Sequence, residues 1–164
     1  MPEKKTIERA RRDKRQGKSP STQAGEFVRE EIEHVREGKH GARSPEQAIA
    51  IGLSKARRSG VKLPPPKRGK AATKKQAARD LARGEKGTRK TSAKRARATR
   101  KALKRAGRKA ATRKALAKHA RKAARKRSAA DRSRAAKKAA RTKGPVVRRR
   151  AAKKAARTRA RRSR

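Results

Sequence analysis

The side chains that could do chemistry in this 164-residue chain are overwhelmingly lysine and arginine. They number 59, against 12 aspartates and glutamates, which gives a formal net charge of +47. Ammonium and guanidinium groups at this density bind phosphate, and self-repulsion on this scale requires a polyanionic partner. Residues 67–164 hold 43 of the cations and only three acidic residues, Asp80, Glu85 and Asp131. The sequence therefore predicts a phosphate-binding segment over residues 67–164.

Phosphate contacts do not read a nucleotide sequence, because sequence is read on base edges. The chain has one phenylalanine and no tyrosine or tryptophan, so it lacks the platforms on which RNA loops and single strands stack. These features predict sequence-independent binding and compaction of duplex DNA. RNA or a ribosome is the alternative partner, because charge alone does not separate two polyanions. The cations expected to contact phosphate are Lys94, Arg95, Arg97, Arg100, Lys101, Lys104, Arg105, Arg108, Lys109, Arg113, Lys114, Lys118, Arg121, Lys122, Arg125, Lys126, Arg127, Lys137, Lys138, Arg141, Arg148, Arg149, Arg150, Lys153, Lys154 and Arg157.

Residues suited to catalysis or metal binding are few. The chain has no cysteine, which removes thiolate sites. Of its three histidines, His34 and His40 could approach each other across a helix end, but a pair without a third ligand indicates no metal site, and His119 is remote in sequence. The acidic residues between Glu26 and Glu37 are expected on a polar helix face, where no dry pocket would separate their pKa values. We therefore expect no enzyme activity, metal or cofactor.

Two helices are expected before residue 64. The first covers residues 22–37, where valine and isoleucine recur at helical spacing, and it ends at Gly38. The second begins at Ser44, because Ser-Pro-Glu-Gln supplies a capping serine, a proline at the first helical position and a glutamine at the third. The expected apolar core of the resulting αα-hairpin is Phe27, Val28, Ile32, Val35, Ile49 and Leu53.

This hairpin, residues 21–63, is the part of the chain expected to fold. Units of about 40 residues rarely hold together alone, so we expect marginal stability or self-association through its apolar face. An adaptor role, with the hairpin binding a protein partner, is the third functional alternative. Gly52 lies on the inner face, either as a tolerated glycine or as the mark of a close helix–helix approach. Residues 1–20 are expected to be charged and flexible, and residues 64–66, three prolines, to form a stiff spacer.

Residues 67–164 are expected to form a long intrinsically disordered tail with helical propensity. Alanine, lysine and arginine are good helix formers, but cations three or four residues apart repel by about 0.2–0.5 kcal/mol per pair. Few acidic residues offset this repulsion, so we expect it to prevail in the free chain. The predicted fold class is mainly α, a small hairpin followed by a disordered tail.

The chain offers no sign of a membrane span or a signal peptide. No apolar run approaches the roughly 18 residues that a span requires, and the N-terminus leads into charged sequence. A cytoplasmic, nucleoid-associated location is therefore expected, without membrane binding.

Two resemblances bear on this interpretation. The basic strings of residues 67–164, such as AAKKAAR at 135–141 and 151–157, resemble the C-terminal tails of linker histones and of bacterial linker-histone-like proteins. Separately, the string QAIAIGLSKAR at 47–57 resembles a small family of uncharacterised bacterial domains that often carry a basic tail. Relatives in that family are sometimes labelled DNA-binding or plasmid-stabilisation proteins. The second resemblance implies a bacterial origin.

Overall fold

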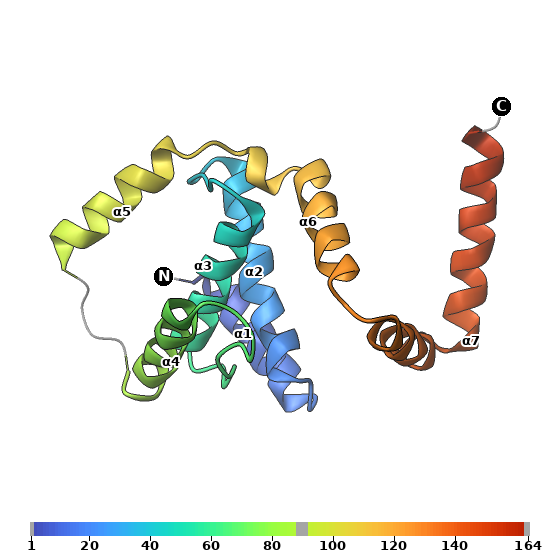
Figure 1. Cartoon of the computed structure of the whole chain (residues 1–164), viewed down its shortest axis with the longest axis horizontal. Helices are drawn as coiled ribbons and strands as arrows, with labels where there is room; N and C mark the ends of the chain where they lie inside the picture. The colour runs from blue at the N-terminus through green and yellow to red at the C-terminus, as the bar shows by residue number, and fades with distance from the viewer. Residues whose placement is uncertain (1, 88–91, 163–164) are drawn as a thin grey trace. The chain divides into compact units, whose positions relative to one another are not determined.

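The computed structural model describes residues 2–87 and 92–162, and these residues are all-α. Two compact units are present, Met1–His119 and Ala120–Arg164. None of the helices in the described ranges is long and apolar enough to cross a membrane. The described residues form seven α-helices and one short 3₁₀ helix (Figure 1), which are α1 (Lys4–Arg15), α2 (Pro20–Glu37), α3 (Pro45–Arg58), α4 (Ala71–Glu85), α5 (Ala93–Arg105), η1 (Lys109–Ala111), α6 (Arg113–Arg125) and α7 (Ala129–Arg162).

Helices α2 and α3 are the two predicted from local sequence signals, and the end of α2 and the start of α3 are where those signals place them, whereas α2 begins two residues earlier than predicted. The Ser44 hydroxyl accepts a hydrogen bond from the backbone N–H of Gln47 at 3.2 Å, which confirms the predicted N-cap of α3. The predicted stop of α2 is also confirmed, because Gly38 has a φ of 81° and takes the left-handed cap conformation. The chain then reverses through residues 39–44 and brings α3 back along α2.

The buried face of α2 is shifted by one position from the predicted stripe. Ala24, Phe27, Glu31 and Val35 follow each other at helical spacing, and each is at most 1% exposed. Of the predicted core, Phe27 and Val35 are fully buried, whereas the other four side chains, Val28, Ile32, Ile49 and Leu53, are half-buried. The expected polar face of α2 was therefore partly wrong, because it included Glu30 and Glu31, which are both buried.

Gly52 marks a close approach of α3 to α2. A Cβ atom at this position would lie 2.7 Å from the Cα atom of Val28, closer than real Cβ contacts come. Ala48 and Ala56, one turn to either side, are buried with it. Small residues on α3 thus let the two backbones pack directly, which settles the question that the sequence left open at this glycine.

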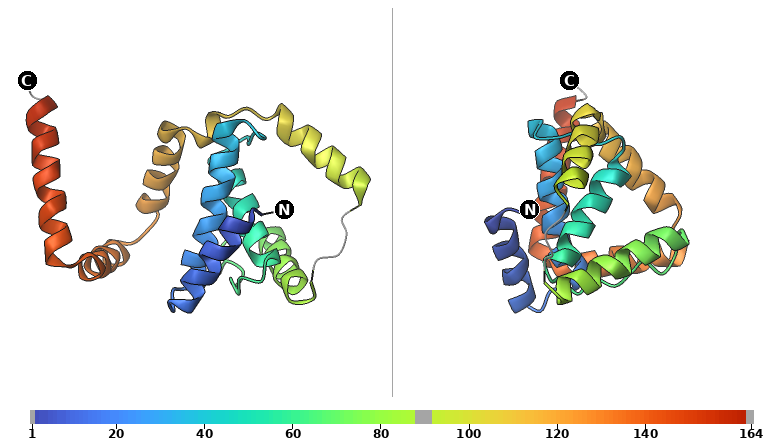
Figure 2. Two further views of the ribbon diagram at one scale, coloured as in Figure 1. Left: turned by 180° about the vertical axis from the view of Figure 1, so that it is seen from behind. Right: turned by 90° about the vertical axis from the view of Figure 1, so that its left-hand side faces the viewer.

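The prediction of a lone hairpin is wrong, because two more helices cover it. Helix α1 lies along α2, and its Ala10 joins Phe27 in one apolar cluster (Figure 2). Helix α4 packs on α3, where buried Asp80 accepts hydrogen bonds from Ser54 and from Arg58. Residues 1–20, expected to be flexible, therefore contain a packed helix. A unit of four helices buries the surface that a hairpin of about 40 residues leaves open.

The prediction of a disordered tail is also wrong. Helices α5, α6 and α7 occupy most of residues 93–162, including a long C-terminal helical stretch. Helix propensity outweighs repulsion here because alanine, lysine and arginine are among the best helix formers, whereas each like-charge pair costs only about 0.2–0.5 kcal/mol in water. The tail even contributes to the core, since Ala110 and Ala111 of η1 are buried in a cluster with Val35 and Ala48.

Helix α7 bends near its middle. Gly144 has a φ of 66° and a ψ of 169°, outside the helical region, and Pro145 follows it. Proline removes a backbone donor and clashes with the preceding turn, so the helix continues in a new direction after this pair (Figure 1).

Candidate nucleic-acid interface

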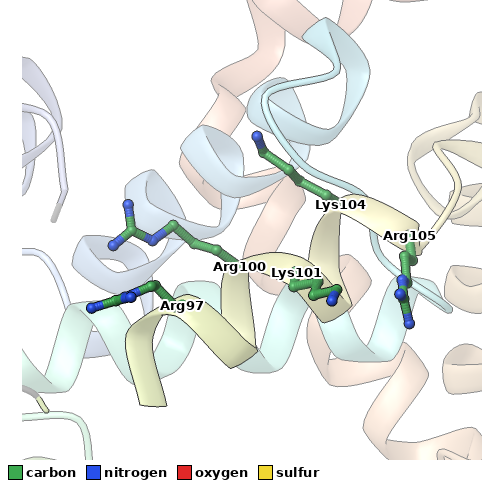
Figure 3. Close-up of a pocket in the computed structure, with 5 residues that line it drawn as sticks. All are labelled: Arg97, Arg100, Lys101, Lys104 and Arg105. Carbon is green, nitrogen blue, oxygen red and sulfur yellow. The ribbon is translucent and has the colours of Figure 1, made fainter. Parts of the chain in front are cut away.

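Helix α5 carries a group of cations on a single helix face. Five of its basic residues recur at positions i, i+3, i+4, i+7 and i+8, which places them on one helix face. They line a shallow depression along the helix (Figure 3), and no acidic residue lies among them. At a rise of about 1.5 Å per residue, the group spans about 12 Å. We call this group the α5 stripe, and it consists of Arg97, Arg100, Lys101, Lys104 and Arg105.

The far side of α5 is held by the loop between α2 and α3. The Gly41 N–H donates to the Leu103 carbonyl at 2.9 Å, and the Ala42 N–H donates to the Gly107 carbonyl at 3.1 Å. A side chain at residue 41 would collide with the Ala106 carbonyl, so only glycine allows this approach. Leu103 is half-buried at this contact. The C-terminal end of α5 is thereby fixed to the unit.

Helix α6, like α5, presents a group of cations on one of its faces. Thr112 caps it by accepting a hydrogen bond from the Ala115 N–H at 3.2 Å. His119 lies on another side of the helix, with its Nδ1 atom 2.9 Å from Glu46 Oε1 of α3, and this contact is the main cause that lowers the pKa of Glu46 to about 2. The predicted phosphate-contacting residues that share one face of α6 are Lys114, Lys118, Arg121, Lys122 and Arg125.

Helix α7 is capped in a way that the sequence could have shown. The Ser128 hydroxyl accepts from the Asp131 N–H at 3.1 Å and donates to the Asp131 carboxylate at 2.9 Å, in a Ser-x-x-Asp sequence typical of a helix start. The Ser128 hydroxyl first, and then Arg134, hold the pKa of Asp131 below its ordinary value. Each half of α7 carries basic residues at helical spacing, Lys137, Lys138 and Arg141 before the bend and Arg150, Lys153, Lys154 and Arg157 after it.

The cations of the tail are free to meet a ligand. Every lysine and arginine from Lys94 to Arg161 is exposed. Within residues 92–162, as far as the structure describes them, Arg134 is the only lysine or arginine at ion-pair distance from a carboxylate. The other predicted contact residues are equally exposed, both those within helices, such as Lys94 and Arg148, and those between helices, such as Arg108 and Lys126.

Two of the acidic residues of α2 are buried and paired within the fold, so they do not compete for these cations as a surface cluster would. Glu30 and Glu31 are buried, and Lys55 of α3 lies 3.3 Å from a carboxylate oxygen of Glu30 and 2.6 Å from one of Glu31. Of the arginines of α2, Arg29 lies 3.4 Å from Glu26. Arg36 instead donates to the Ala111 carbonyl at 3.0 Å and so ties α2 to η1.

Comparison with known proteins identifies one region of the chain. No curated protein and no solved structure matches the chain significantly. The expectation of an uncharacterised domain family, drawn from residues 47–57, is confirmed at that level. Residues 3–68, which carry α1, α2 and α3, match the model of DUF6496, a family of unknown function.

Proposed function

We propose that this protein binds duplex DNA without sequence preference, through phosphate contacts made by its basic helices. The observation that carries the proposal is the α5 stripe, five exposed cations on one face of a helix whose C-terminal end is fixed to the fold. Helices α6 and α7 present further cations at the same helical spacing. These two helices therefore add further positively charged surface that can bind phosphate.

The dimensions of the stripe suit a duplex. Double-stranded DNA carries one phosphate charge per about 1.7 Å of axis, so a length of about 12 Å carries about seven phosphates on its two strands together. Five cations over that length neutralise most of the charge that one side of the duplex presents. Helices that exist before binding also reduce the ordering entropy lost on association.

The same features support compaction. Phosphate neutralisation removes the repulsion that keeps DNA segments apart, and the described part of the tail carries cations on α5, α6 and both halves of α7. The described residues include no tyrosine or tryptophan that could stack on unpaired bases. Duplex DNA is therefore favoured over single strands and RNA loops.

The experiment that tests this function is a competition at fixed salt. A fluorescent duplex of about 30 base pairs is bound to the full chain and displaced by unlabelled duplexes of two unrelated sequences and by a structured RNA of equal charge. We expect the two duplexes to compete equally and the RNA to compete several-fold less well. If the RNA displaced the probe more strongly than either duplex, RNA would be the partner and the proposal would be wrong.

A further inference from the structure

Glu31, His34 and His40 meet at the C-terminal end of α2. One carboxylate oxygen and one ring nitrogen from each histidine all lie within 4.8 Å of one another. Glu31 and His34 are three residues apart on α2 and share a face. The turn at Gly38 carries His40 back over the helix end, and the two imidazole rings are 6.0 Å apart and nearly perpendicular.

The Glu31 carboxylate is buried without a full set of partners. The residue is 0% exposed, and neither of its oxygens has a hydrogen-bond partner of good geometry within the described residues. Two cationic or basic atoms lie close to it, Lys55 Nζ at 2.6 Å from Oε2 and His40 Nε2 at 3.1 Å from Oε1. A buried carboxylate of this kind is stabilised by a positive centre that binds Oε1, the oxygen that Lys55 does not contact.

The orientation of His40 leaves room for such a centre. Its Nδ1 atom lies 3.2 Å from the Gly41 carbonyl oxygen, which can only accept, so Nδ1 carries a proton. The Nε2 lone pair of the neutral ring then faces Glu31 Oε1, and these two electron-rich atoms repel unless a proton or a metal ion lies between them. A histidine whose other nitrogen bonds a backbone carbonyl is the usual form of a metal-binding histidine.

We infer that Glu31, His34 and His40 bind a divalent transition-metal ion, with zinc as the preferred occupant. Two imidazole nitrogens and one carboxylate oxygen form a donor set that suits zinc and not magnesium, which prefers oxygen alone. Tetrahedral zinc, with ligand distances of about 2.0 Å, holds its ligand atoms about 3.3 Å apart. The cluster therefore needs a contraction of at most about 1.5 Å to bind the ion.

Surrounding charges can adjust to the ion. Lys55 also lies 3.3 Å from Glu30, so it can stay paired with that carboxylate when a metal takes Glu31. Glu3 contacts His34 Nε2 at 2.9 Å and Lys39 Nζ at 3.2 Å, and it supplies negative charge beside the site. Because residues 39–44 also hold α5 through Gly41, a bound metal would stiffen the support of the α5 stripe.

The test is a titration of the full chain with zinc, freed of metal beforehand. We expect one zinc ion per chain with a dissociation constant below about 10 µM, an increase in Tm, and tetrahedral absorption bands when cobalt is used instead. The substitutions H34Q and H40Q should each weaken binding at least about 100-fold, since loss of a second-sphere partner alone costs about 10- to 100-fold. Magnesium should not bind.

His119 provides the matched control, because it is the third histidine of the chain and lies outside the cluster. H119Q should bind zinc as the unchanged protein does. The inference would be overturned by the lack of saturable one-to-one zinc binding, by H40Q binding as tightly as the unchanged chain, or by H119Q weakening binding as much as H40Q. None of these variants alters a cation of the tail helices, so the outcome is independent of DNA binding.

Discussion

Asp80 is the residue whose removal should most clearly separate α4 from the rest of the fold. Its side chain is 2% exposed and accepts hydrogen bonds from Ser54, from Arg58 Nε at 2.8 Å and from Gln76 at 3.1 Å. Burial alone would raise its pKa, but these hydrogen bonds and the Arg58 charge together hold the pKa below its ordinary value. The carboxylate is thus stabilised in its charged form, and it joins α3 to α4.

The size of the effect follows from these contacts. A hydrogen bond to a charged group contributes about 1.5–3 kcal/mol when it is buried, whereas an ion pair with a half-exposed arginine contributes at most about 1 kcal/mol. For D80A we therefore expect a loss of about 3 kcal/mol in the free energy of unfolding. Amides of α4 should also lose protection from hydrogen exchange before those of α2 and α3 do.

Asp131 is the matched control, because D131A removes the same side chain and the same charge from an exposed position. We expect that variant to cost less than about 1 kcal/mol. Because the pKa of Asp80 is lowered on folding, its contribution is full above pH 3.8 and is lost as the pH falls through the folded pKa. Urea unfolding at pH 7 and at pH 2.5 measures both effects. Equal losses for the two variants at pH 7, or a D80A loss that does not shrink in acid, would refute this reasoning.

Two more predictions concern single contacts. Gly52→Ala should destabilise the fold by about 1–3 kcal/mol, because its Cβ atom would collide with Val28. Gly25→Ala, at a position with open space around it, should instead stabilise the fold by up to about 1 kcal/mol. Thermal unfolding of both variants separates packing from helix propensity, and two changes of the same sign would contradict the close approach of α3 to α2. The carboxyl of Glu46 should titrate near pH 2 by NMR and move toward 4.5 in H119Q, because His119 is the main cause of the shift; an unchanged midpoint in that variant would show that α6 does not contact α3 there.

Helix ends were predictable from the sequence because their signals are local. Ser44 caps α3 through the N–H of a residue three positions away, and Gly38 ends α2 through its own backbone conformation. Neither requires knowledge of the rest of the fold. The same holds for Ser128 and Asp131, whose spacing is a capping signal that was available in the sequence.

Buried faces were harder to predict because their partners are remote. Glu31 lies within the buried face of α2 only because Lys55 and His40 contact its carboxylate there. For the same reason the histidine pair was interpreted as lacking a third ligand. The tail was mispredicted for another reason, because the sum of small like-charge repulsions was taken to exceed the helix propensity of its alanines, lysines and arginines.

The candidate interface was predictable in composition but not in arrangement. Counting cations identifies the residues able to contact phosphate, and all of those named between Lys94 and Arg157 are exposed. Their grouping on one face of α5, and the fixing of that helix through Gly41, depend on the fold. The order in the tail changes the proposal from a flexible polycation to helices that present cations at set intervals.

The most direct test of the central claim compares two charge variants of the full chain in a salt titration of duplex affinity. One replaces the α5 stripe with glutamine, and the other replaces five exposed α1 cations with glutamine, so that each lowers the net charge from +47 to +42. The α1 set is Lys5, Arg11, Arg12, Lys14 and Arg15.

Each phosphate contact contributes about 0.9 to the slope of log K against log salt. The stripe variant should therefore lose up to about 4.5 from that slope, and the α1 variant should keep nearly the slope of the unchanged protein. If both variants lost the same amount, net charge alone would account for binding. An unchanged slope in the stripe variant would show that α5 is not the interface.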